Sequence, residues 1–593
     1  MASLSESIAR LRTNDKQWQA FGTQGHCVVI APPGSGKTEV LTTRLAFDLL
    51  HHTPQPCGAA CITLTVAAAE QLRTRVHDLH SFRRPNIFIG TVHSFLLNEI
   101  VIPFAPLAGR DDLDTITIVG QGQAKAMLES IVYDVYGPTA DIWNVPSTVE
   151  INRRRMATDE QWARHDPRMK MIADRYVAQL HAEDLIDFTE LVALAIDLTE
   201  RTDVVRKALT AKYPRLYVDE YQDLEPGLDH VVRALCLDPG AASQLFAVGD
   251  PDQAIYGFTG TMPELLERLA THPLVTPVVL ETNYRCGRQI IAMAQAFKES
   301  AAVVSGHRAG GTVNTLFCPN GFSQQCTDAA QWIVDARDRY PLHEIAVLCP
   351  TNEQCEQAAD TLRQAGIPAL YRSNDDYRPT RVTLFIEACA AWCCFGKETS
   401  HYRLADLLRT WRYMLGDQWT AQADATLVAV LLEQARVAAS TSALDFVEAL
   451  NSAGMQSALT RPAMAIDELE IPKLLMVFGG DANGASPLTD LAERARLTDR
   501  VEVRTMVTGK GLEYDAIVVL GLDEDRVPHF AADKSSSQMR EERRKFYVTL
   551  TRARDELLLV YSGFVEWKSG KTNYSGPSRF LDELGLTDRT DYW

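Results

Sequence analysis

The sequence HCVVIAPPGSGKT, residues 26–38, carries an apolar run straight into a loop rich in glycine and proline. A helical pattern follows at residues 38–50, so the stretch predicts a strand, a tight loop and a helix. Its spacing is that of a phosphate-binding loop, with Ala31 at the first glycine position. The competing interpretation is a glycine-rich turn that binds nothing.

Each residue type in this loop has a physical use in binding phosphate. Glycines let backbone N–H groups approach phosphate oxygens, and the N-terminus of the helix adds positive potential. A lysine neutralises the β- and γ-phosphates, and the hydroxyl group after it can bind Mg²⁺. We therefore predict a site for ATP and Mg²⁺ at Gly34, Ser35, Gly36, Lys37 and Thr38.

A second stretch, LYVDEYQDLE at residues 216–225, ends an apolar run in four crowded carboxylates. Such carboxylates repel one another, so we expect a cation beside them. Next to a phosphate-binding loop, Asp219 is expected to hold Mg²⁺, mostly through water, and Glu220 to activate the attacking water. Without that loop, an exposed acidic turn would be the simpler interpretation.

The bulk composition is that of a soluble globular protein of several domains. The chain has 593 residues, 46% of them hydrophobic and 23% charged, and a formal net charge of −18. This charge argues against a surface that binds nucleic acid everywhere but permits a local basic groove. Twelve cysteines without any Cys-x-x-Cys pair indicate reduced thiols in a cytoplasmic protein rather than a metal site. We expect neither a signal peptide nor a membrane span.

Short runs rich in Val, Ile and Leu alternate with helical patterns along the chain. They lack clean alternation, as expected for strands buried on both faces of a parallel sheet. The sequence therefore predicts an α/β protein built from repeated β-α units. The predicted strands lie within residues 26–33, 59–65, 215–220, 244–250, 344–350 and 516–522.

Two long segments interrupt this alternation of strand and helix patterns, because they are helical in pattern and poor in strand signals. We interpret them as helical insertions, one in each half of the chain. The predicted first α/β domain comprises residues 1–103 and 196–278, with the insertion at 104–195. The predicted second α/β domain comprises residues 279–375 and 500–593, with the insertion at 376–499.

Through these and further motifs the chain resembles the superfamily 1 DNA helicases of the UvrD/Rep/PcrA family. The motifs follow that family's order over nearly the whole chain. The matching segments are NDKQ (14–17), TLTVAAAEQLRTRV (63–76), GTVHSF (90–95), LIDFTEL (185–191), VDEYQD (218–223), VGDPDQAIYGFTG (248–260), LETNYR (280–285), EIAVLCPTNEQ (344–354), TGKGLEYDAIVVLGL (508–522), EERRKFYVTLTRAR (541–554) and PSRFLDEL (577–584).

The resemblance implies two RecA-like P-loop domains that hydrolyse ATP between them. It assigns Gln17 to the adenine base, Tyr284 to base stacking and Glu513 to the ribose. Gln253 would sense the γ-phosphate and couple it to DNA. Arg285 and Arg552 would act on the γ-phosphate as arginine fingers. Outside these motifs, Arg552 would be interpreted as a surface ion pair and Tyr284 as a core aromatic.

The resemblance also implies a track for single-stranded DNA. Tyr256 and Phe258 would stack on bases, whereas Thr65, Thr91 and His93 would contact the backbone. A core position remains the alternative for Phe258. Several family residues are replaced, so we expect altered strand binding. The replacements stand at Leu64, Val66, Ala67, Thr259 and Val507, and Glu39 takes the place of an arginine.

A basic cluster in the first insertion permits two interpretations. It contains Arg153, Arg154, Arg155, Arg164, Arg168 and Lys170. It could contact duplex DNA at a junction between single-stranded and double-stranded DNA, or form a solvated face of mixed charge.

The implied activity is that of an ATP-dependent 3′–5′ DNA helicase or translocase, as used in DNA repair. The alternative is a DNA-sensing ATPase that serves a nuclease partner, because the chain also resembles helicase subunits of antiviral defence systems such as Gabija. An unrelated P-loop kinase is disfavoured by the later motifs.

Overall fold

The computed structural model describes residues 3–80, 86–108, 117–137, 144–300, 303–373, 376–461, 464–479, 485–496, 499–567 and 570–587, except for the side chain of Phe258. The chain divides into two compact units. The two-sheet unit comprises Met1–Gly90, Arg206–Ser373 and Thr498–Trp593. The helical unit comprises Thr91–Val205 and Asn374–Leu497.

The first six-stranded sheet is centred on the strand that leads into the phosphate-binding loop. β1 pairs in parallel with β7 and with β8, so Val28 lies between Ala247 and Pro277. Cys27 and Val29 point to one face, where they share a core with Leu41 and Leu45 of the following helix. The strand order is β3 (Ile87–Thr91), β2 (Ala59–Thr63), β6 (Arg215–Val218), β7 (Gln244–Gly249), β1 (His26–Ile30) and β8 (Val275–Val279).

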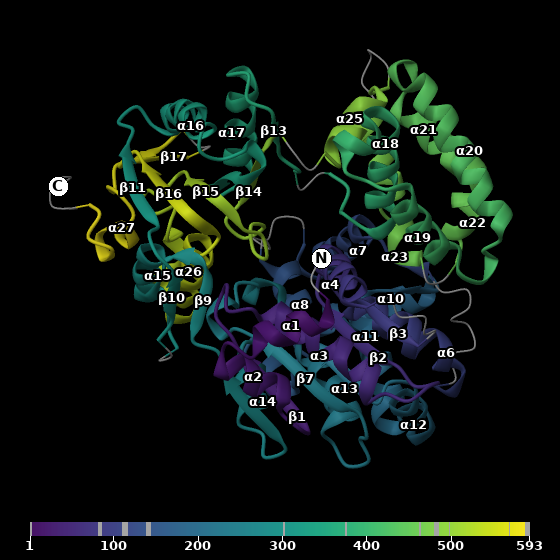
Figure 1. Ribbon diagram of the computed structural model, residues 1–593. Helices are drawn as coiled ribbons and strands as arrows, with labels where there is room; N and C mark the ends of the chain where they lie inside the picture. The colour runs from purple at the N-terminus through teal and green to yellow at the C-terminus, as the bar shows by residue number, and fades with distance from the viewer. Residues whose placement is uncertain are drawn as a thin grey trace. The chain divides into compact units, whose positions relative to one another are not determined.

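The second six-stranded sheet combines segments that are far apart in sequence, which is why teal strands lie together with yellow-green and yellow strands in Figure 1. Every pairing in it is parallel. The strand order is β11 (Thr312–Phe317), β16 (Ala553–Tyr561), β15 (Tyr514–Val519), β12 (Ile345–Cys349), β14 (Val501–Thr505) and β13 (Ala369–Leu370).

The central strand of this sheet, β12, shows why the sequence lacks alternation. Val347 and Cys349 are buried on one face of the sheet, in the core that contains Ile333. Ala346 and Leu348 are buried on the other face, in the core that contains Phe546. Because both faces are covered, each position must be apolar, as parallel sheets require.

Helices and two short strand pairs complete the two-sheet unit. The helices are α1 (Leu4–Leu11), α2 (Asp15–Gly22), α3 (Lys37–His51), α4 (Val66–Leu79), α12 (Asp203–Lys212, which begins in the helical unit), α13 (Pro226–Cys236), α14 (Glu264–Ala270), α15 (Arg288–Ala294), α16 (Phe322–Ala336), α17 (Asn352–Gln364), α26 (Ser536–Leu550) and α27 (Arg579–Glu583). The strand pairs are β9 (Thr282–Gly287) with β10 (Ser305–Arg308), and β17 (Val565–Glu566) with β18 (Thr572–Asn573).

The helical unit packs around aromatic and aliphatic side chains, with Trp411 fully buried and stacked on Phe385 at 5.9 Å between ring centres. Its first segment contains α5 (Val92–Phe95), a π-helix (Leu96–Val101), α6 (Ile102–Phe104), β4 (Thr117–Ile118), α7 (Gln121–Tyr136), α8 (Val145–Arg154), α9 (Asp159–Trp162), α10 (Pro167–Ala182), β5 (Leu185–Ile186) and α11 (Phe188–Arg201). Its second contains α18 (Arg381–Ser400), α19 (Leu404–Leu415), α20 (Ala421–Val437), α21 (Ala443–Leu450), α22 (Gln456–Leu459), α23 (Ala465–Glu468), α24 (Ile471–Phe478) and α25 (Leu488–Arg494).

The predicted α/β class with parallel sheets is confirmed, and each of the six predicted runs overlaps a strand. Strands at or near the sheet edges were not predicted, and neither was β16, whose Leu557 and Leu558 are buried on opposite faces of the sheet. β11, an edge strand, is only partly buried, and β14 alternates buried with half-buried residues, so neither shows a continuous apolar run. Within the described ranges, no helix combines the length and the apolar character needed to cross a membrane.

Candidate active site

The loop between β1 and α3 has the backbone shape of a phosphate-binding loop. Gly34 and Gly36 have φ of 66° and 84°, which favour glycine. A Cβ atom on Gly34 would lie 2.5 Å from the Cβ of Arg285, and one on Gly36 would lie 2.6 Å from Nε2 of Gln17. No side chain caps the start of α3, so its N-terminal N–H groups remain available to phosphate.

Residues from both sides hold this loop in place. The Gln17 side chain donates from Nε2 to the carbonyl of Ser35 at 2.8 Å. From β9, Asn283 donates to the carbonyl of Pro33 at 2.6 Å, and the Tyr284 N–H donates to the carbonyl of Gly34 at 2.8 Å. The loop is therefore connected to the segment that carries Arg285. Asn283 was not singled out from the sequence, although it lies inside the predicted motif.

Asp219 and Glu220 follow the end of β6 and differ in electrostatic state. Lys37 Nζ lies 3.4 Å from both carboxylate oxygens of Glu220. Burial raises the pKa of Glu220, but Lys37, Lys510 and Gln222 outweigh it and hold the pKa below its ordinary value. Burial, and then the charge of Glu220, raises the pKa of Asp219. Glu220 also has a left-handed backbone, with φ of 54° and ψ of 47°.

A continuous series of hydrogen bonds leads from Glu220 toward the second sheet. Gln222 donates to Glu220 at 2.5 Å and accepts from the Asp250 N–H at 2.9 Å. Gln253 donates to the Asp250 carboxylate at 2.6 Å and accepts from Arg552 at 3.3 Å. All of these side chains except that of Glu220 are at least nine-tenths buried. The candidate nucleotide site is thus connected by hydrogen bonds to Arg552, the residue immediately before β16 of the second sheet.

The two predicted arginine fingers lie at this junction. Arg552 is 2% exposed and donates to the carbonyl oxygens of Val548 and Leu512. Burial and the neighbouring Arg285 lower the pKa of Arg552 to about 10, which leaves it charged at neutral pH. Arg285 forms an ion pair with Glu513. Two like charges in a buried place favour an anion as their partner.

Lys510 connects the two sheets directly and was given no role from the sequence. Its Nζ forms an ion pair with Asp223 and donates to the carbonyl of Gln253 at 2.5 Å. The pair is nearly buried, with side-chain exposures of 6% and 1%. In the sequence, only the position of Lys510 within the GKGLE motif indicated that it could have a role.

The unsatisfied polar atoms at this site match a metal–nucleotide complex. Asp219 Oδ1, Asp223 Oδ1 and Arg285 Nη1 are buried and have no hydrogen-bond partner. Carboxylate oxygens in this state suit a cation, and a guanidinium nitrogen suits a phosphate oxygen. The donor set therefore fits Mg²⁺ together with a nucleoside triphosphate.

The predicted DNA-binding residues are distributed over both units. Thr65 caps α4 and is exposed, and the Tyr256 ring is half-buried with Lys510 Nζ 4.9 Å from its centre. Thr91 and His93 belong to the helical unit, where burial and Arg154 lower the pKa of His93 to about 4. Phe258 lies in a short 3₁₀ helix, and its side chain is outside the described residues.

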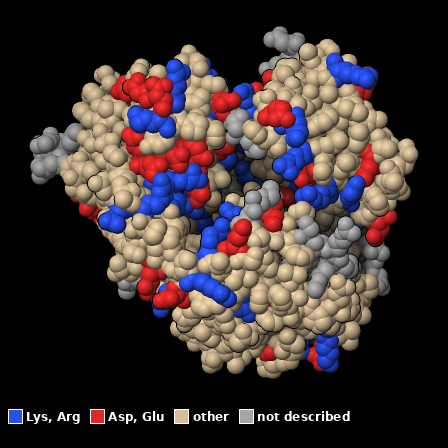
Figure 2. All heavy atoms as spheres, viewed as in Figure 1, with Lys and Arg blue, Asp and Glu red and all other residues tan. Residues whose placement is uncertain are grey.

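Within the basic cluster, carboxylates accompany most of the cations. Arg153 is paired with Asp187, Arg154 with Glu150, Arg168 with Asp166 and Lys170 with Asp159. Lys and Arg are likewise interspersed with Asp and Glu on the face in Figure 2. These pairs favour a face of mixed charge over a track for duplex DNA.

Comparison with known proteins agrees with this geometry. Residues 13–273 match the UvrD/REP helicase N-terminal domain, and residues 484–563 match the UvrD-like helicase C-terminal domain. An ATP-dependent DNA helicase PcrA of Staphylococcus epidermidis is 24% identical over 96% of this chain and 86% of its own length. One from Staphylococcus aureus is 25% identical over the same shares. The chain therefore belongs to the UvrD/Rep/PcrA-like family of ATP-dependent DNA helicases.

Proposed function

We propose that this helicase hydrolyses ATP with Mg²⁺ between its two sheets and thereby moves 3′ to 5′ along single-stranded DNA. The observation that carries the proposal is the continuous series of hydrogen bonds from Glu220 through Gln222, Asp250 and Gln253 to Arg552. It joins a carboxylate suited to activate water with an arginine suited to the γ-phosphate. A change in the bound nucleotide would therefore alter the side-chain contacts of both sheets.

Each residue has a role set by its charge and position. Lys37 and the uncapped start of α3 would hold the phosphates, with Gln17, Tyr284 and Glu513 around the nucleoside. Thr38 and Asp219 would hold Mg²⁺, which would neutralise phosphate charge. Glu220 has a lowered pKa and so remains a carboxylate at neutral pH, able to accept a proton from water. Arg285 and Arg552 would stabilise the charge that develops on the phosphoryl oxygens.

The magnesium site is tested by thermal melting. Mg²⁺ with a non-hydrolysable ATP analogue at a hundred times its Kd should stabilise the protein by about 2.7 kcal/mol. Asp219→Asn should reduce that shift clearly, whereas Asp197→Asn on the helical unit should not. An unchanged shift in Asp219→Asn would remove Asp219 from the metal site.

The DNA track is tested by the response of ATP hydrolysis to an oligothymidylate. We expect a large increase with DNA, because stacking on aromatic rings contributes about 1–3 kcal/mol per base. Tyr256→Ala should raise the DNA concentration that gives half stimulation, and Leu274→Ala, at an exposed apolar residue, should leave it unchanged. Unwinding of 3′-tailed but not 5′-tailed duplexes would establish the direction.

The domain division is part of the same proposal. The first motor domain would comprise residues 1–103 and 196–278, and the second residues 279–375 and 500–593. The strands of the first sheet fall within 26–279 and those of the second within 312–561, which supports this division. Spin labels placed in the two motor domains should report a change in distance on addition of nucleotide.

The replaced residues at Leu64, Val66, Ala67, Thr259 and Val507 favour a second candidate, a motor that senses DNA for a nuclease partner. Its signature would be ATP hydrolysis that hardly responds to DNA in the isolated protein and responds strongly in a complex purified from the native host. Strong stimulation and unwinding by the isolated protein would exclude this candidate.

A further inference from the structure

Asp252 is a buried carboxylate that lies outside the series of hydrogen bonds from Glu220 to Arg552. It belongs to the 3₁₀ helix Pro251–Gln253, directly before Gln253, and is only 2% exposed. A carboxylate in such a place is costly unless donors surround it. All the donors to the side chain of Asp252 described here come from one short segment, residues 298–300, which follows α15.

Three hydrogen bonds and one ion pair join this segment to Asp252. One carboxylate oxygen accepts from the N–H of Glu299 at 2.9 Å and from the N–H of Ser300 at 3.1 Å. The other accepts from the Ser300 hydroxyl at 2.5 Å and lies 3.6 Å from Nζ of Lys298, whose side chain is 5% exposed. Hydrogen bonds to a charged acceptor are roughly twice as strong as neutral ones. The contact therefore fixes residues 298–300 against the 3₁₀ helix.

This segment is the end of an arm, residues 282–300, which comprises β9, α15 and a further 3₁₀ turn. The start of the arm is bonded to the phosphate-binding loop through Asn283 and Tyr284. Its end is bonded to Asp252, in the loop that follows β7 of the first sheet. Arg285 lies on the arm between these two anchors. A segment held at one point can pivot, whereas one held at both ends keeps its orientation.

The outer side of the arm packs against α26, which belongs to the core of the second sheet. Arg543 donates to the carbonyl of Ala296 at 2.8 Å, and Arg544 donates to the Glu299 carboxylate at 2.8 Å. The fully buried Phe297 ring lies edge-on to an aromatic ring of α26, with 4.9 Å between ring centres. The arm is thus packed on the second sheet, while both of its ends are bonded to loops of the first.

We propose that Asp252 is a positioning residue for Arg285. It fixes the far end of the arm, so that Arg285 keeps its place beside the phosphate-binding loop. Asp252 and Gln253 share one 3₁₀ turn, and a shift of Gln253 on loss of the γ-phosphate would therefore move the arm as well. The inference rests on the proposed function, because Arg285 serves hydrolysis only if ATP is bound between the sheets.

The contact itself is tested by amide hydrogen exchange without nucleotide, read by mass spectrometry on peptides that span residues 295–300. Asp252→Ala combined with Lys298→Met removes the carboxylate together with the buried cation that it faces. This double variant should speed exchange at the Glu299 and Ser300 amides at least about tenfold. Ser300→Ala removes only the hydroxyl bond and should have a smaller effect. Equal exchange in the parent protein and the double variant would overturn the proposal.

The positioning role is tested by steady-state ATP hydrolysis. The double variant should lower kcat about tenfold, which corresponds to about 1.4 kcal/mol, and should change KM less than twofold because the phosphate-binding loop is intact. Asp252→Asn keeps an oxygen that can accept from both N–H groups, so its kcat should lie between the two. A rise in KM with unchanged kcat would overturn the role, since Asp252 would then act on nucleotide binding.

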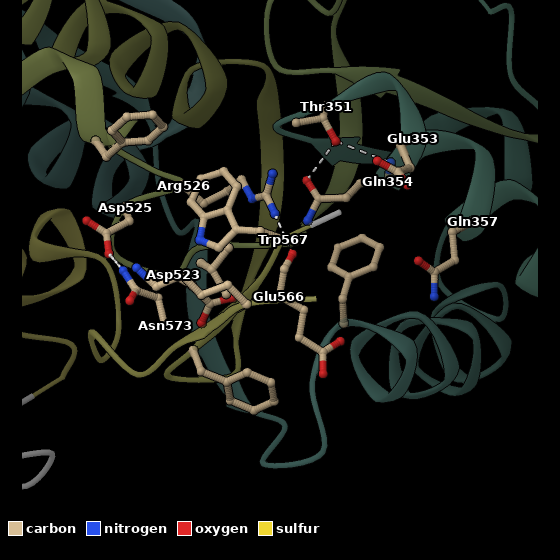
Figure 3. A pocket seen from close by; sticks show the side chains of 15 residues that line it. Thr351, Glu353, Gln354, Gln357, Asp523, Asp525, Arg526, Glu566, Trp567 and Asn573 are labelled. Carbon is tan, nitrogen blue, oxygen red and sulfur yellow. Dashed lines mark hydrogen bonds between the residues drawn. The ribbon is translucent and has the colours of Figure 1, made fainter. Parts of the chain in front are cut away.

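A matched control comes from the second sheet, beside a cavity of about 1050 Å³ that Trp567 also lines (Figure 3). There Asp525 accepts from the side chains of Asn573, at 2.7 Å, and Ser575. Asp525→Asn should leave basal kcat and KM within twofold of the parent values. An equal fall of kcat in the Asp525 and Asp252 variants would overturn the proposal, because the effect would not be specific to the arm.

The two proposals fail in different ways. Hydrolysis by the parent protein with unchanged kcat in both Asp252 variants would overturn the role of Asp252 alone. A parent protein that does not hydrolyse ATP would overturn the proposed function, and with it any role of Asp252 in hydrolysis.

Discussion

The strands β1 and β12 are both interior strands of six-stranded sheets, yet the loops that follow them have opposite chemistry. Each strand lies between two parallel neighbours and leads into a helix. After β1, two glycines at positive φ expose the uncapped start of α3, and Lys37 adds a cation. After β12, Thr351 caps α17 with its own side chain and Glu353 adds an anion. A few loop residues on a common scaffold thus decide whether the strand end attracts phosphate or repels it.

The largest expected effect comes from removing the cation in the loop after β1. Lys37→Ala should lower ATP hydrolysis by at least about a hundredfold, since it removes the cation at the phosphates and beside Glu220. Steady-state ATP hydrolysis measures the loss, with Lys125→Ala on an exposed helix as the control. Activity that persists in highly purified Lys37→Ala protein would show that the nucleotide binds elsewhere.

A second effect, on stability rather than on turnover, concerns the direct connection between the two sheets. Lys510→Ala leaves Asp223 buried without its cation, and breaking a buried ion pair typically costs about 3–5 kcal/mol. We expect a clearly lower unfolding midpoint in urea. Lys510→Ala combined with Asp223→Asn should recover most of the loss. If the double variant is no more stable than the single one, the ion pair is not the cause.

The pH dependence of stability tests the electrostatic part of the comparison, through the pKa of Asp250. Burial, and then Asp252, raises the pKa of Asp250 to about 6, against about 3.9 in an unfolded chain. Between these values the folded state binds more protons, so the contribution of Asp250 is present at low pH and is lost as pH rises toward 6. Its full size is about 3 kcal/mol.

The measurement is the melting temperature at pH 4.5 and pH 7. Asp250→Asn should lose less stability over this interval than the parent protein, and Asp197→Asn should follow the parent. Parallel profiles for all three proteins would contradict the raised pKa.

The smallest expected effect concerns the loop after β12. Thr351→Ala removes the cap of α17 and should cost about 1 kcal/mol of stability. ATP hydrolysis should stay unchanged, because Thr351 is not among the residues proposed to bind ATP. A large loss of hydrolysis in Thr351→Ala would mean that the two strand ends are not independent.

The sequence predicted most of the strands that are buried on both faces, with the exception of β16, and missed those that are partly exposed. β12 is a continuous apolar run because both of its faces are covered. β11 is partly exposed and has no such pattern. A strand at an edge is defined by its neighbour rather than by its own residues, so sequence patterns alone could not find it.

The residues of the candidate site also divide into those that the sequence predicts and those that only the folded chain reveals. Lys37, Asp219 and Glu220 could be predicted because their chemistry requires fixed residue types at fixed spacing. Lys510 and Asn283 act through a partner far away in sequence, Asp223 and Pro33 respectively, so only the folded chain reveals their contacts. The cavity beside Trp567 has no sequence signature, because its lining is assembled from four separate segments.

The left-handed backbone at Glu220 has a consequence for how this helicase can evolve. A residue with a Cβ atom at positive φ costs about 1–2 kcal/mol, and glycine would remove that cost together with the carboxylate. Because the carboxylate also pairs with Lys37 and accepts from Gln222, glycine would lose these contacts at the same time. Backbone strain and charge pairing therefore act on this position in opposite directions, and a random library screened for survival at high temperature would be expected to admit glycine here only where Lys37 is replaced as well.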